Sequence, residues 1–330
     1  MPTVRSAVCG MCTAVLAMGL ALSLAPSMAS AQGDAYPSHP IVVVVPFPAG
    51  GPTDGSARLF AQAMSTALHQ SVVIENRPGA GGTLGSALVA RAPADGYTLL
   101  WGSTSTLAVA PGLYKNVAYS GKSFVPIGMA LRGPLMLAGR TSLEAKTLPE
   151  LLALAKKRQV TVGTAGNGSI GHLATAYLIE TAKVPFTHVP YKGGAPAIND
   201  TIGGQVDLVF DNASQLYPQV KAGHLRAYMV TGSMPYAPAP EVPLARSLLG
   251  ADFQAYSWFG LVAPAATPAA VVRKLTDAMT TAAASPEIRK NLADTGLEPG
   301  LPTAKEFADV IDADFRKWSA TIVRANVQAD

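Results

Sequence analysis

Residues 41–54 read IVVVVPFPAGGPTD, and this stretch decides the fold class. Its first five residues are all β-branched, which predicts a strand buried on both faces. A glycine-rich turn follows, and the apolar spacing of residues 55–68 predicts an amphipathic helix. A strand, a glycine-rich turn and a helix in this order form the repeating unit of an α/β protein.

The same succession recurs along the chain. We predict further strands at residues 72–75, 97–101, 160–163, 187–189, 207–210 and 226–230, and helices at 148–158, 169–182, 195–202 and 216–222. Two shorter strand-like stretches, 125–130 and 135–138, lie between the two runs. Because strands that alternate with helices favour a parallel sheet covered on both faces, two such runs predict two lobes.

The C-terminal part differs from the rest. A proline-rich stretch at residues 234–243 predicts an irregular loop. A strand at residues 258–262 and three helices follow, at residues 269–284, 286–295 and 303–324. We expect these helices to pack back on the first lobe.

Residues 1–31 predict a cleaved secretory signal peptide. The segment carries one charge, Arg5, then an apolar run and the small-residue pattern Ala29-Ser30-Ala31. Its apolar run is interrupted and too short to serve well as a membrane anchor. We expect cleavage between Ala31 and Gln32, and therefore a periplasmic protein.

Cysteine usage and charge exclude several classes of function. Cys9 and Cys12, the two cysteines, lie in the signal segment, so the mature chain has no disulfide, thiolate nucleophile or cysteine metal site. One of the 25 basic residues, Arg5, also lies there, which leaves 24 basic against 21 acidic residues. This near-balanced charge, without a basic stripe, argues against a nucleic-acid partner.

Two glycine-rich loops are candidates for ligand binding. In parallel sheets, ligands bind beyond the carboxyl ends of the strands, where loops lead into helix N-termini. Free backbone N–H groups and the helix dipole favour an anion there. In the first loop, Gly50 and Gly51 let the backbone approach a ligand closely, while Thr53 and Asp54 are N-cap residue types. Capping is the simplest role for the Asp54 side chain.

The second loop reads TAGNGSIGH at residues 164–172 and contains G-x-G-x-x-G at Gly166, Gly168 and Gly171. A dinucleotide site would also need an acidic residue at the end of the next strand. That strand instead reads THVPYK at residues 187–192. An anion site at the helix start therefore explains the glycines better than a dinucleotide, and no cofactor is expected.

No constellation of residues predicts catalysis. The nucleophile elbow G-x-S-x-G is absent, and His172 and His188 are isolated without metal-ligand spacing. A packed or hydrogen-bonded role is favoured for His172. Acidic residues of the last helix, Asp309, Asp312 and Asp314, are interpreted as a solvated face. We therefore expect neither an enzyme nor a metal site.

The chain resembles the substrate-binding proteins of tripartite tricarboxylate transporters, also called the Bug family. The resemblance covers nearly all of the mature chain in family order. The stretches that carry it, besides residues 36–45, are PFPAGGPTD (46–54), ENRPGAGG (75–82), RAPADGYTLL (91–100), AGNGS with HL (165–173), HVPYKG (188–193), GGQVD (203–207), KAGHLRA (221–227) and WFGL (258–261). Gly55 departs from the bulky aliphatic residue usual at that position.

The resemblance implies a two-lobed periplasmic-binding-protein (Venus-flytrap) α/β fold, type II-like. One lobe would comprise residues 36–134 and 256–330, the other residues 135–255. The cleft between them would hold a ligand carboxylate through loop amides and bridging waters, with Phe47 covering the ligand. With the loop argument, this places the ligand-binding residues at Phe47, Ala49, Gly50, Gly51, Thr53, Asp54, Ser103, Thr104, Thr164, Ala165, Gly166, Asn167, Gly168, Ser169, His172 and Asp211.

The function implied is capture of a small organic carboxylate and its delivery to the integral-membrane permease subunits of the transporter. Dicarboxylates, tricarboxylates, amino acids and aromatic acids all occur as ligands in the family, so the resemblance does not name the ligand. A monomer is expected. Two alternatives remain open: a sensor component that presents its ligand to a membrane kinase, and a periplasmic enzyme that uses the same cleft.

Overall fold

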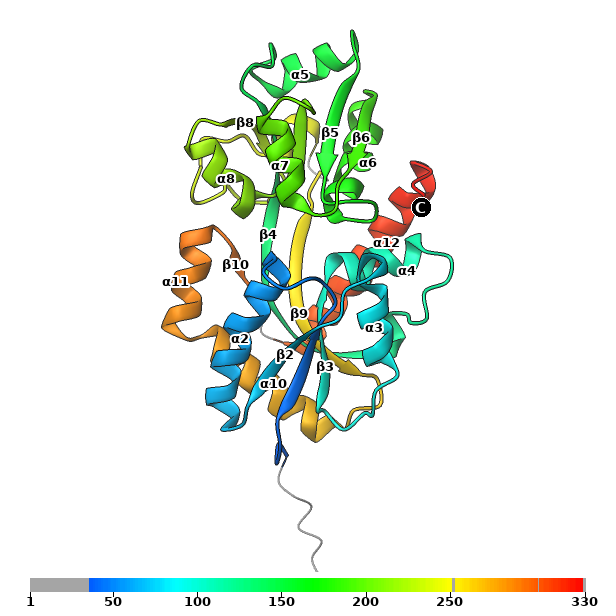
Figure 1. Cartoon of the computed structure of the whole chain (residues 1–330), viewed down its shortest axis with the longest axis vertical. Helices are drawn as coiled ribbons and strands as arrows, with labels where there is room; N and C mark the ends of the chain where they lie inside the picture. The colour runs from blue at the N-terminus through cyan, green and yellow to red at the C-terminus, as the bar shows by residue number, and fades with distance from the viewer. Residues whose placement is uncertain (1–35, 251–252, 302, 329–330) are drawn as a thin grey trace, which may run out of the picture. The chain divides into compact units, whose positions relative to one another are not determined.

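Two sets of three parallel strands form the framework of the protein (Figure 1). The computed structural model describes residues 36–250, 253–301 and 303–328, so the expected signal peptide lies outside the described residues. The first set has the order β2-β1-β3 and comprises β1 (Ile41–Val45), β2 (Val72–Asn76) and β3 (Thr98–Ser103). The second set has the order β6-β5-β7 and comprises β5 (Val160–Thr164), β6 (Phe186–Pro190) and β7 (Leu208–Asn212).

A single long strand, β4 (Phe124–Arg140), joins the two sets. Its first part pairs antiparallel with β9 (Tyr256–Pro264), which in turn pairs with β3. Its second part, from Leu135 on, pairs antiparallel with β7 and β8 (Leu225–Val230). The short β10 (Glu298–Pro299) also pairs with β4. Residues 37–330 consequently form one compact unit.

The prediction of two separate strands at residues 125–130 and 135–138 was wrong, because β4 is continuous. The strand contains Pro126 and Pro134, although proline cannot donate a hydrogen bond to a neighbouring strand. Its register against β9 shifts twice, between Pro126 and Gly128 and between Met129 and Leu131, so one shift directly follows Pro126. Such bulges absorb a residue without ending the strand.

Helices cover the strands of both sets. In the first part of the chain they are α2 (Pro52–Leu68), the short η1 (Ala80–Gly82), α3 (Thr83–Ala90), the π-helical turn η2 (Thr104–Val109), α4 (Ala110–Leu113) and η3 (Gly121–Ser123). The middle contributes α5 (Leu148–Ala155), α6 (Ile170–Ala182), α7 (Gly194–Ile202), α8 (Ala213–Lys221) and α9 (Ala245–Leu249). The last three are α10 (Ala269–Ala283), α11 (Pro286–Thr295) and α12 (Ala304–Arg324).

As expected, C-terminal helices return to the first set: α10 packs on α2, and α12 packs on η2 and α4. No helix in the described part of the chain is both long and apolar enough to cross a membrane.

Tryptophan side chains anchor the return of α12 to the sheet. Trp258 of β9 and Trp318 of α12 are each only 1% exposed. The indole Nε1 of Trp258 donates to Asp314 of α12 at 2.7 Å. The interpretation of the acidic residues of α12 as one solvated face was therefore wrong for Asp314. Burial raises the pKa of Asp314, with the indole hydrogen bond opposing that shift.

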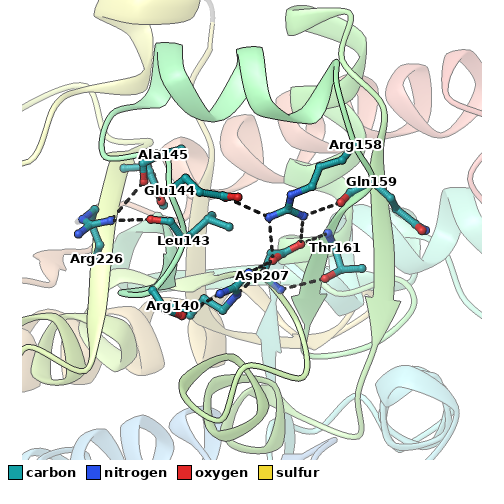
Figure 2. A network of polar contacts seen from close by, with 11 residues as sticks. Arg140, Leu143, Glu144, Ala145, Arg158, Gln159, Thr161, Asp207 and Arg226 are labelled. Carbon is teal, nitrogen blue, oxygen red and sulfur yellow. Dashed lines mark hydrogen bonds and ion pairs between the residues drawn. The ribbon is translucent and has the colours of Figure 1, made fainter.

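A polar network fastens the amino ends of β5 and β7 (Figure 2). Asp207 accepts hydrogen bonds from Arg140 at 2.9 Å and from Arg158 at 3.0 Å. Its Oδ2 also accepts from the backbone amide of Thr161 at 3.2 Å, and its own amide donates to the Thr161 hydroxyl at 2.9 Å. These bonds tie β4, β5 and the start of β7 together at the ends opposite the glycine-rich loops.

Candidate functional site

The register of β4 sets the carboxyl ends of the two parallel sets facing each other. Ser103, the last residue of β3, pairs with Phe259 of β9, and Phe259 in turn pairs with Leu131 of β4. Asn212, the last residue of β7, pairs directly with Leu135 of β4. Since β9 is antiparallel to both of its neighbours and β7 is antiparallel to β4, β3 and β7 run toward each other. Along β4, the levels of these two ends are four residue steps apart, roughly 13 Å at about 3.3 Å per residue.

The first loop ends three residues earlier than predicted, because α2 begins at Pro52 with Gly51 as its N-cap. Proline suits the first helical position, where its fixed φ is already helical and its missing N–H is not needed. Thr53 and Asp54 therefore lie in the first turn of α2. The prediction that Asp54 caps the helix was wrong, because the N-cap is Gly51. Their backbone amides have no acceptor within the helix.

The Asp54 side chain organises the first loop from inside. Its Oδ2 accepts from the Gly50 amide and from Arg58 Nε, both at 2.9 Å. Its Oδ1 accepts from Asn76 at 2.9 Å, and the same Asn76 amide group donates to the Phe47 carbonyl at 3.0 Å. The pKa of Asp54 is lowered to about 2, chiefly by the hydrogen bond from Arg58. Burial acts in the opposite direction, and the hydrogen bonds from Gly50 and Asn76 lower the pKa further. Sequence reasoning did not assign these roles to Arg58 and Asn76.

The remaining first-loop residues lie around this scaffold. Phe47 is half-buried, and its ring lies beside Gly82, where a Cβ would approach Phe47 Cζ at 3.1 Å. Ala49 and Gly50 are exposed, and Gly50 has a φ of +82°, which favours glycine. Because the Gly50 amide is bound to Asp54, the amides that this loop offers to an anion are those of Thr53 and Asp54.

The second loop is closed by its own hydrogen bonds. The Gly166 amide donates to the Thr164 hydroxyl at 3.3 Å, and the Ser169 amide donates to the Gly166 carbonyl at 3.1 Å. The Ala165 carbonyl accepts from Gly193 of the next loop at 3.2 Å. Ser169 is the N-cap of α6, and its hydroxyl accepts from the His172 amide at 3.2 Å. The amides that α6 offers to an anion are therefore those of Ile170 and Gly171.

Each glycine of the G-x-G-x-x-G sequence has a structural reason. Gly166 and Gly168 have φ values of +124° and +73°, which side chains rarely adopt. Gly171 has an ordinary φ, but a Cβ there would overlap the Phe210 carbonyl of β7, so α6 packs closely on that strand. Asn167 lies between the first two glycines at the tip of the loop, and Thr164 is buried at the end of β5.

Two histidines support the second loop from behind. The rings of His172 and His188 are stacked, with centroids 3.8 Å apart and planes 5° from parallel. His172 Nδ1 accepts from the Gly168 amide at 3.2 Å, and His188 Nε2 lies 2.7 Å from the Thr164 hydroxyl. The interpretation of these histidines as isolated was wrong, because α6, which carries His172, packs on β6, which carries His188.

Ser103 and Thr104 lie at the end of β3, but their side chains are engaged by the protein. The Ser103 hydroxyl caps η2 by accepting from the Thr106 amide. The Thr104 hydroxyl accepts from the Trp258 amide at 3.0 Å and donates to the Tyr256 carbonyl at 3.4 Å. The structure places both residues at the predicted edge, where they tie β3 to β9.

Asp211 is a buried carboxyl group near the end of β7. Its Oδ1 accepts from the Asn212 amide at 2.7 Å and from the Asn212 side chain at 3.0 Å. Among the described residues its Oδ2 has no hydrogen-bond partner, and it lies against Gly194, the first residue of α7. Burial raises the pKa of Asp211 to about 6, with the Asn212 hydrogen bonds opposing the shift. An unpartnered buried oxygen of this kind accepts a hydrogen bond readily.

Comparisons with known proteins identify the family of this chain. A family model described as the tripartite tricarboxylate transporter family receptor matches residues 56–327. The chain is similar to the periplasmic binding protein BugD, at 34% identity and a TM-score of 0.80 over 89% of this chain and 100% of that one. It is also similar to an R. palustris protein solved with adipate (31%, TM-score 0.81, 89% and 99% covered) and to MatC from Rhodopseudomonas palustris solved with malate (33%, TM-score 0.78, 87% and 100% covered).

These matches confirm the predicted fold class, the two-lobed α/β fold of periplasmic binding proteins. They also confirm the expectation of a receptor rather than an enzyme, since the matched family is one of binding receptors. With a family model covering most of its length, the chain belongs to the tripartite tricarboxylate transporter receptor family.

Proposed function

We propose that this protein is a periplasmic receptor that captures a small organic carboxylate and delivers it to the permease subunits of a tripartite tricarboxylate transporter. The observation that carries the proposal is the pair of helix N-termini at facing strand ends, α2 from one sheet and α6 from the other. Each offers first-turn amides and the positive end of its dipole to an anion.

Two lobes that close on the ligand follow from the same arrangement. We assign residues 36–134 and 256–330 to one lobe and residues 135–255 to the other, because β4 changes its strand partners between Pro134 and Leu135. A ligand favours the closed state only through contacts with both lobes. A carboxylate held by the Thr53 and Asp54 amides on one side and the Ile170 and Gly171 amides on the other makes such contacts.

Asp211 supports a further property of the ligand. The two relatives solved with ligands hold a dicarboxylate without a hydroxyl group, adipate, and one with a hydroxyl group, malate. The unpartnered Oδ2 of Asp211 accepts a hydrogen bond from a hydroxyl or ammonium group. We therefore propose that a hydroxy- or amino-substituted carboxylate binds better than its unsubstituted counterpart.

A thermal-shift screen tests carboxylate binding. Malate, succinate, adipate, citrate and benzoate are compared with the uncharged diamides of succinic and adipic acid. A carboxylate at about 100 times its Kd stabilises the folded chain by about 2.7 kcal/mol, whereas the diamides should leave Tm unchanged. Malate should also exceed succinate if Asp211 selects a hydroxyl group. Equal shifts for acids and diamides would contradict the anion site.

Export and delivery need separate tests. Mass spectrometry of the protein recovered from the periplasm should find an N-terminus at Gln32, as the signal-peptide pattern predicts. Uptake of the carboxylate that binds should stop when either this protein or the permease is deleted. Uptake that persists without the permease would contradict the proposed delivery to the permease, but not the proposed binding of the carboxylate.

A further inference from the structure

The stacked histidines His172 and His188 hold the second loop at two points. His172 bonds the Gly168 amide, and His188 bonds the Thr164 hydroxyl, which itself accepts from the Gly166 amide. Between them the rings support both ends of the loop that leads into α6. The rings are not among the groups proposed to bind the anion, which are backbone amides. The histidine pair would therefore affect the ligand through the loop.

The hydrogen bond to Gly168 defines the proton on His172. Because the Gly168 N–H is a donor, Nδ1 must be the unprotonated nitrogen and the neutral ring carries its proton on Nε2. Any further proton on His172 must go to Nδ1. The ring would then present an N–H to the Gly168 N–H, and the bond that holds the loop would be replaced by two opposed donors.

We propose that the His172–His188 pair is a proton-sensitive support of the second loop: neutral rings keep residues 164–169 in their binding shape, and uptake of one proton by the pair releases the loop and weakens ligand binding. This regulation rests on the proposed carboxylate-binding function of the same site.

The surroundings of the pair disfavour protonation at neutral pH. Both rings line a cavity of about 480 Å³ whose charged residues are Glu180 and Lys183 of α6 and Arg324 of α12. Glu180 is paired with Arg324 at 2.5 Å, so Lys183 leaves the lining with one net positive charge. Burial lowers the pKa of His188 to about 4, and the adjacent His172 contributes to that shift. Two stacked rings do not both carry a charge readily.

The direction of the effect follows from linkage. A released loop would return the buried ring to its ordinary pKa of 6.5, whereas the held loop lowers the pKa of His188 to about 4, so release becomes more favourable as the pH drops from 6.5 toward 4. Affinity is therefore full at pH 7.5 and falls in acid once the released loop predominates. The competing effect is attraction between an imidazolium and the ligand carboxylate, which would raise affinity over the same range. The sign of the pH dependence therefore decides between loop release and direct attraction.

The test uses the mature chain and His172→Asn. The Asn Oδ1 takes the place of Nδ1, accepts from Gly168 and does not titrate. His172→Gln is a second variant without a titrating ring, for use if the Asn variant does not fold. His69→Asn is the matched control, because His69 ends α2 in the left-handed conformation that Asn accepts.

The first measurement is made without ligand. Hydrogen exchange of the peptide covering residues 164–173, corrected for intrinsic rates, is compared at pH 7.5 and 5.0. We expect the wild type and the His69→Asn chain to lose protection about tenfold at pH 5.0, equivalent to about 1.4 kcal/mol, and His172→Asn to keep it. Equal protection of the wild type at both pH values would overturn the proposal.

The second measurement is calorimetric titration with malate at pH 7.5 and 5.0. Protonation of malate itself affects all variants equally, so the ratio of wild type to His172→Asn isolates the ring. We expect wild-type affinity to fall about tenfold more than that of the variant. A wild type that gains affinity relative to the variant in acid would overturn loop release. If malate binds no variant, the proposed ligand is wrong, and the exchange measurement alone decides the loop proposal.

Discussion

Asp54 and Asp211 are two buried carboxyl groups whose surroundings shift their pKa values in opposite directions. Asp54 is surrounded by donors: an arginine, an asparagine and a backbone amide. Asp211 has donors on only one oxygen. Solvation lost on burial is replaced in the first case and only in part in the second, so the pKa of Asp54 is lowered to about 2 and that of Asp211 is raised to about 6.

Replacing Asp54 with Asn should loosen the first loop. A carboxylate whose pKa is lowered from 3.8 to about 2 contributes stability above pH 4 that is lost as the pH falls toward 2. We expect Asp54→Asn to cost about 1–2 kcal/mol at pH 7 and to weaken carboxylate binding. Urea unfolding and titration calorimetry measure the two effects. Asp309→Asn, which removes an exposed ion pair with Lys305, is the control and should change little.

Replacing Asp211 with Asn should have the opposite effect on stability. An acid whose pKa is raised to about 6 on folding makes the protein less stable as the pH rises from about 4 through 6. Asn keeps an oxygen for the Asn212 donors and never ionises. We expect Asp211→Asn to be more stable than the wild type by about 1 kcal/mol at pH 7.5 and equal to it at pH 4. Thermal unfolding at the two pH values checks this, and a variant less stable at pH 7.5 would show that the charge has a partner.

At the scale of elements, the proposed binding groups lie in the loops between strand and helix, while a polar network joins the strands at their opposite ends. α6 begins directly after a loop whose glycines have left-handed φ values, and α2 begins at a proline after a loop held by Asp54. The amino ends of β5 and β7 are fixed by Asp207 and its arginines. The proposed binding site and the polar network thus lie at different ends of the strands.

Replacing Gly168 with Val should abolish binding in a folded chain. A Cβ there would approach Leu113 Cδ2 at 2.8 Å and the Tyr114 hydroxyl at 3.2 Å, and the φ of +73° is strained for Val. We expect affinity to fall more than about tenfold, equivalent to about 1.4 kcal/mol, with circular dichroism unchanged. Gly121→Ala is the control, because its Cβ would meet nothing within 4 Å. Unchanged affinity in the Val variant would exclude the second loop from the site.

Replacing Asp207 with Asn should destabilise the sheet without touching the site. Burial alone would raise the pKa of Asp207, but hydrogen bonds from Arg158 and Arg140 lower it overall. Its side chain is 12% exposed, and its loss leaves Arg140 without its ion-pair partner and Arg158 with only the more distant Glu144, at 3.5 Å. We expect a cost of about 2–3 kcal/mol, measured by urea unfolding at pH 7. The difference from the wild type should shrink below pH 4, as the wild-type carboxylate becomes protonated.

At the scale of the molecule, α12 and α6 are joined by the ion pair Arg324–Glu180 at 2.5 Å. α12 packs on elements of the first parallel set, and α6 packs on the strands of the second. The pair therefore crosses the boundary that we propose between the lobes. An exposed pair of this kind contributes little to overall stability, but we expect it to favour one state of the proposed equilibrium between open and closed lobes.

Replacing Arg324 with Ala should change that equilibrium. Arg324 is 51% exposed, so we expect global stability to change by less than about 1 kcal/mol. Ligand affinity should change by a factor of about five or less, together with the radius of gyration of the ligand-free chain. Small-angle scattering and calorimetry measure both. Lys290→Ala, which removes an ion pair within α11, is the control and should leave both quantities unchanged.

The candidate site was predictable as two loops but not as a set of contacts. The loops follow β-branched strands and precede amphipathic helices, which are local patterns. That Gly50, Gly166 and Gly168 use their amides internally depends on Asp54, Thr164 and His172, which are brought into place by the folded backbone. The amides left for an anion, those of residues 53–54 and 170–171, therefore lie two to five residues after these glycines.

The sequence by itself determined the α/β class, the alternation of strands and helices, the family and the two glycine-rich loops, because these rest on periodicity and on short motifs. Only the tertiary structure decided that β4 is one strand shared by both sheets, that His172 stacks on His188, and that Asp314 is partly buried beneath Trp258. These features depend on pairing and packing between residues far apart in the chain, and no local spacing of residues records which partners meet.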